Sequence, residues 1–529
     1  MQITVLVDGK ENGPYTVEDV RKYLATGQLQ PQMLAWREGM QDWQELGSYP
    51  EFHNLGGKTP AGTKSARTSL YVGLAVISVT LIGLLGWQFL RGTGSGSTQI
   101  GKAENSPPAA AESSDPSLPQ TLEALQEYYK DPAAGQNAAS YFLKGFAAIQ
   151  VSASDKKSAN LPLLGQAKLP MPGTPIGAGM SGAISAMMRR NQAAWDSFRK
   201  GASFKESRYP VDLTKGDETL LPHLAKVKEA VMLSGVFALG YSQTGKWKEA
   251  GEAVRVGYAL GRSLSAEPLV LSQNVRRACD NVNLNSLQLV LNHASIPLEE
   301  LIRLQEMLRG IVEQEAMGVS YTRAIVGERA VGLAHFDLSP EKLQSFFQGE
   351  RFQGGRSEEI AALVKKANKN RKADRQFYLE TFDQILLARK EPLPIRLKAN
   401  DILSRRVVAA QSQDLVFSSL LPTLGLPNEA DDLLALRIAE AAIALERYRV
   451  SNENHYPSTL GELVPKYLQS LPEDPFVGQP IKFSKTETGY KISSVGPVPD
   501  ANRPGGVAAQ PREIVFNLVN PPKPKDVAP

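Results

Sequence analysis

One long apolar run constrains this chain more than any other feature of its sequence. The run extends over residues 70–90 and contains no charged residue, with only Ser78, Thr80 and Gln88 as polar interruptions. Because about 20 apolar residues are needed to cross a bilayer as a helix, the sequence predicts one transmembrane helix here. A buried core helix is the alternative. A signal peptide fits less well, because it would stand at the extreme N-terminus.

The charges on the two sides of the run predict an orientation. Lys58, Lys64 and Arg67 precede it, whereas Arg91 and Lys102 follow it. Positive residues are enriched on the cytoplasmic side of membrane proteins. The slight excess before the run therefore predicts a cytoplasmic N-terminus.

Segments rich in Gly, Ser and Pro flank the run on both sides. Such a composition does not pack into a core and is typical of flexible linkers. The expected order is a domain at residues 1–55, a linker at 56–69, the transmembrane helix at 70–90, a flexible linker at 91–119, a mainly α-helical domain at 120–430, a smaller α+β part at 431–520 and a disordered tail at 521–529.

The composition limits the classes of protein that fit. The chain has 529 residues, which is room for about three or four compact units. Hydrophobic residues make up 42% and charged residues 22%, which excludes wholesale disorder. The net charge is only +4, so no nucleic-acid partner is predicted. Cys279 is the single cysteine, and it cannot form an internal disulfide.

Residues 1–55 have the pattern of a small α+β domain. A β-branched run opens the chain, and Thr16 precedes a helical stretch as an N-cap residue would. Gly27 suits the left-handed position that ends such a helix. Trp36 and Trp43 are large side chains for so short a unit. They are expected to supply much of its core.

The same segment carries a motif. Gly13 and Pro14 precede an aromatic residue, and a W-x-x-G-M-x-x-W pattern runs from Trp36 to Trp43. This segment resembles the bacterial GYF-like domain, a domain of unknown function, and the resemblance implies a small α+β fold. Relatives in the eukaryotic GYF family bind proline-rich peptides on an aromatic surface. The chain departs from that family at residues 27–29, where Gly-Gln-Leu aligns with the name-giving tripeptide.

The resemblance implies a binding site made of aromatic side chains. The residues assigned to it are Tyr15, Tyr23, Trp36 and Trp43. Tyr23 aligns with a tryptophan of the family. The alternative is that the two tryptophans belong to the core and bind nothing. The expected partner is a proline-containing peptide or protein.

Residues 120–430 are predicted to be mainly helical. Leu298, Leu301 and Leu308, for example, recur at helical spacing, which is typical of a buried stripe. The spacing of Tyr241 and Trp247 matches half of a tetratricopeptide repeat, but a stable array needs about three copies and only one is present. An irregular array of helical hairpins is therefore expected.

A Pro- and Gly-rich segment and a basic segment interrupt this helical pattern. Residues 161–182 are rich in Pro and Gly and are predicted to form a long ordered loop or lid. The basic run at residues 365–375 is interpreted as a solvated helix face, with contact to anionic lipid or glycan as the alternative.

In the C-terminal part, the spacing of apolar residues predicts a helix at residues 433–450, and alternating patterns after it predict antiparallel strands. Its short motifs resemble the globular part of type II secretion pseudopilins. The matching residues are Tyr456, Pro457, Leu460, Leu471, Pro472, Asp474, Pro475, Phe476, Gly478, Ser494, Gly496, Gly505 and Gly506. The resemblance implies a fold rather than pilus assembly, because a prepilin carries its apolar helix at the very N-terminus. Val498 and Pro499 interrupt the family's calcium loop near Asp500, so no metal is predicted.

A search for catalytic motifs returns no assignment. The chain has no H-E-x-x-H, C-x-x-C, G-x-S-x-G or Walker pattern. Gly177, Gly179 and Gly182 spell G-x-G-x-x-G, but a Pro-rich stretch precedes them instead of a strand. The five histidines are scattered singly. No catalytic residue, metal or cofactor is therefore predicted.

These observations predict a multidomain chain with a small α+β GYF-like domain, one transmembrane helix, a mainly α-helical large domain and a C-terminal α+β pseudopilin-like module. The predicted function is that of a bacterial inner-membrane interaction protein and not an enzyme, coupling a cytoplasmic docking domain to a periplasmic helical domain. The alternatives are a periplasmic hydrolase with its site in the helical domain, and an atypical component of a secretion or pilus system.

Overall fold

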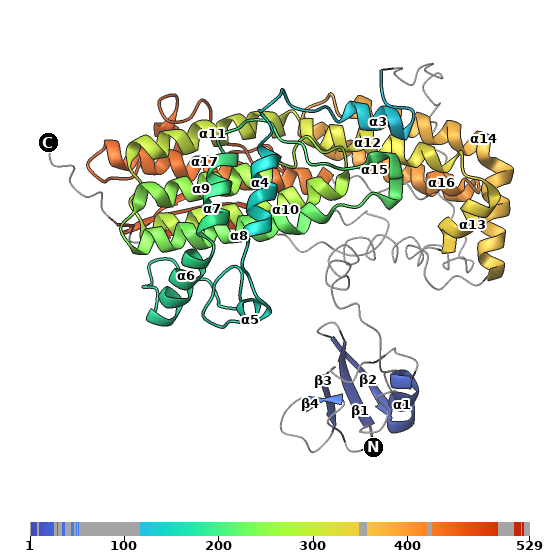
Figure 1. Cartoon of the computed structure of the whole chain (residues 1–529), viewed down its shortest axis with the longest axis horizontal. Helices are drawn as coiled ribbons and strands as arrows, with labels where there is room; N and C mark the ends of the chain where they lie inside the picture. The colour runs from blue at the N-terminus through green and yellow to red at the C-terminus, as the bar shows by residue number, and fades with distance from the viewer. Residues whose placement is uncertain are drawn as a thin grey trace. The chain divides into compact units, whose positions relative to one another are not determined.

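The computed structural model of the chain separates into two compact units, Met1–Leu70 and Tyr71–Pro529, which are described one at a time (Figure 1). The described residues are 2–7, 10–25, 29, 34–37, 44–46, 49, 51, 117–348, 357–419, 426–495, 513–519 and 521–522.

The first unit is a small antiparallel sheet with one helix. The strands stand in the order β2-β1-β3-β4, so β1 is a central strand that pairs with β2 and β3. The elements are β1 (Gln2–Val7), β2 (Lys10–Thr16), α1 (Val17–Ala25), β3 (Leu34–Arg37) and β4 (Gln44–Glu45).

Strand alternation sets the core of the first unit. Ile3 and Val5 in β1 and Ala35 in β3 are fully buried, and Val20 of α1 packs on them. Side chains two apart on a strand point to the same face, so this face is the one that α1 covers. The Tyr49 hydroxyl donates a hydrogen bond of 2.7 Å to the backbone oxygen of Ala35, which closes the core.

The start of α1 follows from its sequence. The Asp19 backbone N–H donates to Thr16 Oγ1 at 3.2 Å, and the Thr16 backbone N–H donates to Asp19 Oδ2 at 3.1 Å. These two bonds satisfy backbone groups that the first turn of a helix leaves unpaired. Thr16 is thus the N-cap that the sequence predicts.

The second unit is mainly helical. Its described α-helices are α3 (Leu122–Tyr128), α4 (Ala138–Ala148), α5 (Ala153–Lys156), α6 (Ala178–Arg190), α7 (Gln192–Gly201), α8 (Pro222–Gln243), α9 (Trp247–Arg262), α10 (Val270–His293), α11 (Leu298–Ala316), α12 (Val319–His335), α13 (Pro340–Gln348), α14 (Ser357–Ala388), α15 (Leu393–Ser412), α16 (Val416–Ser419) and α17 (Leu426–Ser451). The long central helices α8 and α17 are buried on most sides, and neighbouring helices such as α9 and α11 bury one face against them.

Two glycines let helices α4 and α7 approach closely. A Cβ added at Gly145 of α4 would lie 2.1 Å from the Phe198 ring of α7. A Cβ added at Gly201 of α7 would lie 2.5 Å from the Phe142 ring of α4. Each ring therefore fills the space that a glycine of the partner helix leaves empty, which is the close packing expected of a protein interior.

The C-terminal elements share the core of the helices before them. Strands β5 (Lys482–Lys485), β6 (Gly489–Val495) and β7 (Glu513–Val519) form an antiparallel sheet in that order. The buried side chains of β6 and β7 belong to the same apolar cluster as those of α8, α10 and α17. Strands β5 and β6 lie where the alternating pattern predicts them. Helix α17 begins earlier than predicted, at Leu426.

The predicted transmembrane helix requires a correction. Among the residues that the structure describes, no helix combines the length and the apolar character that crossing a bilayer requires. Residues 70–90 themselves lie outside the described part of the chain. The long apolar helix α8 is buried in the core and carries Lys226, Lys228 and Glu229 in its N-terminal half.

The fold class therefore changes to a small α+β unit and a mainly helical unit that includes a three-stranded sheet. The single-span membrane protein and its inner-membrane location are not supported. The predicted coupling across a membrane depended on that span and loses its support with it.

Candidate functional site

The first unit holds an aromatic pair on its helix-covered side. Tyr15 in β2 lies opposite the buried Ile3, and Tyr23 projects from α1. The two rings meet edge to face, with centroids 5.4 Å apart and an interplanar angle of 76°. Both side chains are half-buried and pack against the apolar core. Each ring therefore keeps part of its surface open to solvent.

Trp36 lies on the other face of the sheet. It pairs with Thr4 across β1 and β3, and its neighbour Ala35 points into the core. Because adjacent strand residues point to opposite faces, Trp36 projects away from the face that holds Ile3 and Val5. It is half-buried there.

An ion pair stands beside these aromatics. The Arg37 guanidinium lies 2.7 Å from Glu51 Oε1 and 5.1 Å from the centre of the Tyr49 ring. A backbone hydrogen bond at Glu51 and the Arg37 guanidinium lower the pKa of the Glu51 carboxyl. Burial raises the pKa of the Tyr49 hydroxyl. Neither Tyr49 nor Arg37 belongs to the motif residues predicted from the sequence.

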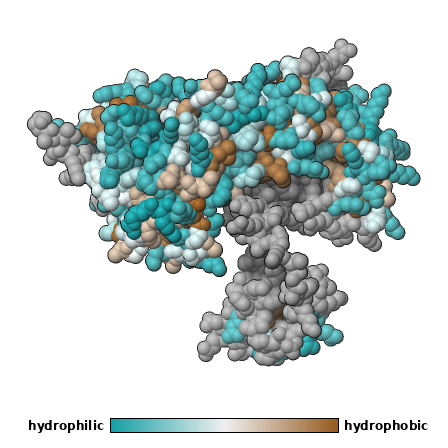
Figure 2. Space-filling view, viewed as in Figure 1, coloured by the Kyte–Doolittle hydropathy of each residue, from teal (hydrophilic) through white to brown (hydrophobic). Residues whose placement is uncertain are grey.

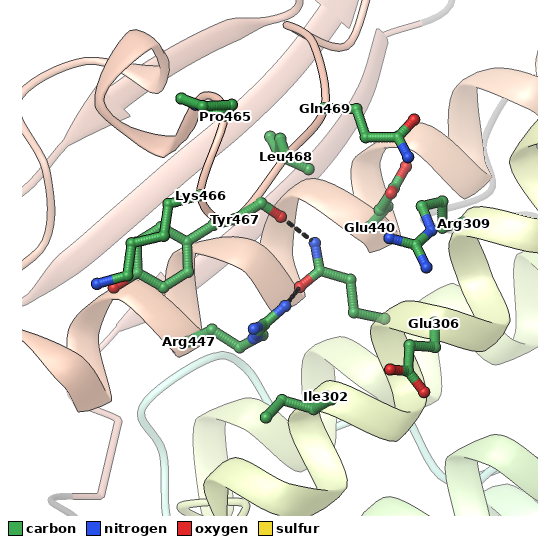
Figure 3. Close-up of a pocket in the computed structure, with 11 residues that line it drawn as sticks. Ile302, Glu306, Arg309, Glu440, Arg447, Pro465, Lys466, Tyr467, Leu468 and Gln469 are labelled. Atoms are coloured by element: carbon green, nitrogen blue, oxygen red, sulfur yellow. Dashed lines mark hydrogen bonds between the residues drawn. The ribbon is translucent and has the colours of Figure 1, made fainter.

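The second unit contains a cavity of about 220 Å³ between α11, α17 and residues 464–469 (Figure 3). Helices α11 and α17 lie side by side along this stretch (Figure 1). The residues that line the cavity are Ile302, Gln305, Glu306, Arg309, Glu440, Arg447, Pro465, Lys466, Tyr467, Leu468 and Gln469.

Hydrogen bonds fix the wall of this cavity. The Gln305 side-chain amide donates to the backbone oxygen of Tyr467 and accepts a bond of 2.7 Å from Arg447 Nη1. The Arg447 guanidinium also lies 5.7 Å from the centre of the Tyr467 ring. Gln305 of α11 therefore connects α17 to residues 464–469 through hydrogen bonds, and these bonds fix the position of the cavity wall.

Three charged side chains of the cavity stay unpaired. Within the described residues, Glu306, Arg309 and Glu440 make no hydrogen bond and no ion pair within 4.0 Å. Burial raises the pKa of the Glu440 carboxyl to about 7, and Glu313 adds to the rise while Arg309 and Arg437 oppose it. An ionisable group that changes charge near neutral pH in a cavity marks a functional-site candidate.

A second group of charges is buried deeper in the same unit. Arg276 Nη1 donates to Asp432 Oδ2 at 2.8 Å, and Arg276 Nη2 donates to Glu315 Oε2 at 3.0 Å. Arg262 binds Glu315 Oε1 at 2.7 Å and also contacts Asp280. This buried ionic cluster, Arg262, Arg276, Asp280, Glu315 and Asp432, joins helices α9, α10, α11 and α17.

Arg276 and the three carboxylates of the ionic cluster are inaccessible, whereas the Arg262 side chain at its edge is 13% exposed. Arg276 is fully buried, and Asp280, Glu315 and Asp432 are each 1% exposed. Burial raises the pKa of Asp280, whereas the two arginines hold the pKa of Asp432 below its usual range against the effect of burial. A substrate cannot reach these groups, so we assign the cluster to the packing of the helices rather than to chemistry.

The comparisons with known proteins match one part of the chain. The family model GYF domain 2 matches residues 5–52. The first unit is a GYF-like domain. No curated protein and no solved structure matches the chain.

The structure separates the predicted aromatic set of the GYF-like domain. Tyr15 and Tyr23 lie together, but Trp36 lies on the opposite face of the sheet. Trp43 lies outside the described residues. The assignment of these four residues to a binding site stays a prediction, since their distribution over two faces leaves two candidate surfaces.

The pseudopilin-like interpretation of residues 431–520 receives no support, because no comparison matches this region. Three of its motif residues do meet in the structure. The Ser494 hydroxyl of β6 donates to Asp474 Oδ2, and Asp474 Oδ1 accepts a 2.9 Å bond from the Phe476 backbone N–H. The buried Asp474 thus fastens the turn to the sheet. Asp500 lies outside the described residues.

The Pro- and Gly-rich loop is ordered but does not line the cavity. The backbone oxygen of Thr174 lies 3.0 Å from His293 Nε2 of α10, and Gly173 lies against Val519 of β7. Gly177 stands immediately before α6 as its N-cap, so the G-x-G-x-x-G pattern belongs to a loop and a helix start. Among the described residues no cluster of His, Cys, Asp and Glu could hold a metal.

Exposed apolar side chains do not gather into a site on the surface that can be seen. Figure 2 shows the visible face of the second unit as mainly hydrophilic, with small scattered apolar spots. Scattered apolar residues are normal for a protein surface and mark no interface. The cavity is therefore the strongest candidate site of the second unit.

Proposed function

We propose that this chain is an interaction protein whose GYF-like domain binds a proline-containing peptide or protein segment. The family match over residues 5–52 carries the proposal. A binding role, rather than catalysis, also agrees with the lack of catalytic motifs in the sequence.

The aromatic residues of the domain support this proposal physically. Proline-rich segments are extended and already ordered, so they lose little entropy on docking against aromatic grooves. The Tyr15–Tyr23 pair offers two half-buried rings at an angle of 76°. Trp36 offers a third half-buried ring on the opposite face. The first surface is favoured because two rings from two elements meet there.

The experiment is a titration of the full chain with a fluorescent proline-rich peptide and with its alanine-substituted counterpart. Tyr23→Ala is expected to weaken binding by about tenfold or more, since stacked aromatic contacts contribute roughly 1–3 kcal/mol at hot spots. Trp36→Ala reports on the opposite face. Glu18→Gln, an exposed change on α1, is the matched control.

Circular dichroism and amide hydrogen exchange establish that each variant keeps its fold. If Trp36→Ala abolishes binding and Tyr23→Ala does not, the binding surface is the opposite face. If the unaltered chain binds neither peptide, the proposed function is wrong.

A further inference from the structure

The cavity between α11, α17 and residues 464–469 is built like a site for a small molecule. Its wall is fixed by the bonds from Gln305 to Tyr467 and from Arg447 to Gln305. Sites for drug-sized ligands occupy about 300–1,000 Å³. The present cavity, at about 220 Å³, suits a molecule of smaller size.

Both signs of charge line this cavity from both helices. Glu306 and Arg309 project from α11, and Glu440 and Arg447 project from α17. In Figure 3, Arg447 lies on one side of the cavity, and Arg309 and Glu440 lie on the other. Acidic and basic groups that line one cavity usually pair with one another when they are partly buried, because an isolated charge is costly to desolvate.

These groups nevertheless stay unpaired within the part of the chain that the structure describes. Glu306, Arg309 and Glu440 make no ion pair there. Arg447 donates through Nη1 to Gln305, whereas its Nη2 makes no hydrogen bond within the described residues. A metal cation or a simple anion would satisfy only one sign of charge. A zwitterion would satisfy both.

We propose that this cavity binds a small zwitterion that carries one ammonium group and one carboxylate, such as a free amino acid. The carboxylate lies at Nη2 of the Arg447 guanidinium, where a charge-assisted hydrogen bond can form. The ammonium lies at the Glu440 carboxylate, with Glu306 nearby. The site is contained in the second unit, so it does not depend on peptide binding by the GYF-like domain.

The ionisation of Glu440 makes the binding depend on pH. The charged groups around this carboxyl are Glu306, Arg309 and Glu313 of α11 and Arg437 and Arg447 of α17. An ammonium ligand requires the carboxylate form of Glu440, and burial raises the pKa of this carboxyl to about 7. Affinity is therefore expected to rise between about pH 6 and about pH 8.

The test is isothermal titration of the full chain with the standard L-amino acids, one at a time, at about pH 8. Ethylamine and propionate are the half-probes, since each keeps one charged group of alanine. At least one amino acid is expected to bind, and both half-probes are expected to bind about tenfold more weakly or not at all. Binding should weaken at about pH 6.

Two variants and a control connect the binding to the cavity. Glu440→Gln keeps the size of the side chain and should reduce affinity about tenfold and remove the dependence on pH. Arg447→Met should reduce affinity by a similar factor. Glu299→Gln, an exposed change on α11 outside the cavity, should bind like the unaltered chain.

The proposal is overturned if no amino acid binds with a dissociation constant below about 10 mM. If propionate alone binds as tightly as the amino acid, the cavity is an anion site. If ethylamine alone does so, it is a cation site. Unchanged affinity in Glu440→Gln would place the binding elsewhere. If Arg447→Met fails to fold, Glu440→Gln still decides, because Glu440 makes no hydrogen bond whose loss could unfold the unit.

Discussion

The two units place charge in opposite ways. In the GYF-like domain, the described core is apolar, and the Arg37–Glu51 pair lies half-exposed at its edge. In the helical unit, the buried ionic cluster stands in the interior and Arg276 is fully buried. The small unit therefore depends on apolar burial and local hydrogen bonds, whereas the large unit also depends on the mutual compensation of charges that water cannot reach.

Buried charges affect not only how stable the helical unit is but also which arrangement of its helices is favoured. An apolar core tolerates rearrangement as long as its volume is conserved. A buried arginine must meet its carboxylates, and Arg276 meets Glu315 and Asp432, which come from two other helices. The cluster therefore favours one arrangement of α9, α10, α11 and α17 over others that would bury as much apolar surface.

Among the changes considered, removal of the buried Arg276 is expected to lower the free energy of unfolding the most. Arg276→Met leaves Glu315 and Asp432 with less compensation in the interior, and breaking such a group costs about 3–5 kcal/mol. Urea unfolding followed by circular dichroism measures the loss. The matched control is Lys366→Met, since the Lys366–Asp414 pair is exposed and should contribute less than about 1 kcal/mol. Equal losses in the two variants would contradict the stabilising role assigned to the buried ionic cluster.

The second prediction concerns the half-buried Glu440. Its folded-state pKa of about 7 lies above the ordinary value of 4.5, so the folded chain binds more protons than the unfolded chain between these values. Stability is therefore lost as the pH rises from about 4.5 to about 7 and levels off above that range. Glu440→Gln removes this penalty.

The measurement is the difference in the free energy of unfolding between Glu440→Gln and the unaltered chain at several pH values. The variant should be more stable by roughly 2 kcal/mol at about pH 8, allowing for the partial exposure of the side chain, and nearly equal at about pH 4.5. Glu299→Gln serves as the control. A gain that is the same at both pH values would exclude titration of Glu440 as the cause.

Local patterns predicted much of the fold. The alternation in residues 489–495 predicts the strand that β6 forms, because Tyr490 and Ile492 enter the apolar core while Lys491 between them stays half-exposed. Thr16 caps α1 as predicted, since a cap depends on three neighbouring residues only. The transmembrane prediction for residues 70–90 also came from a local pattern, but no described helix supports it.

The buried ionic cluster and the cavity could not be predicted in this way. Arg276 and Asp432 are separated by 156 positions, and each one is an ordinary charged residue within a helical pattern. Arg309 and Glu440 meet only because α11 and α17 pack side by side. One signal was present in the sequence: the otherwise apolar helix α17 carries charged residues on several sides, which predicts that it has charged partners.

The third prediction returns to the GYF-like domain. Tyr49→Phe removes the hydroxyl that donates to the buried Ala35 oxygen and leaves that acceptor unsatisfied. The expected loss is about 1–2 kcal/mol. Amide hydrogen exchange resolved by peptide should show faster exchange in β1 and β3 and no change in the helical unit. Tyr23→Phe, which keeps a half-exposed ring, is the matched control. A change in the helical unit would mean that the two units do not unfold independently.

The smallest loss of stability is expected from a change at Thr16, the N-cap residue of α1. Thr16→Ala removes the acceptor of the Asp19 backbone N–H and should destabilise α1 by about 1 kcal/mol, while Thr16→Ser keeps the acceptor and should change little. Faster amide exchange in α1 measures the effect. Because the small core contains few buried side chains, the loss should spread to the Tyr15–Tyr23 pair and weaken peptide binding in proportion. If α1 frays and binding stays unchanged, the aromatic pair is not the binding surface, and Trp36 on the opposite face becomes the candidate.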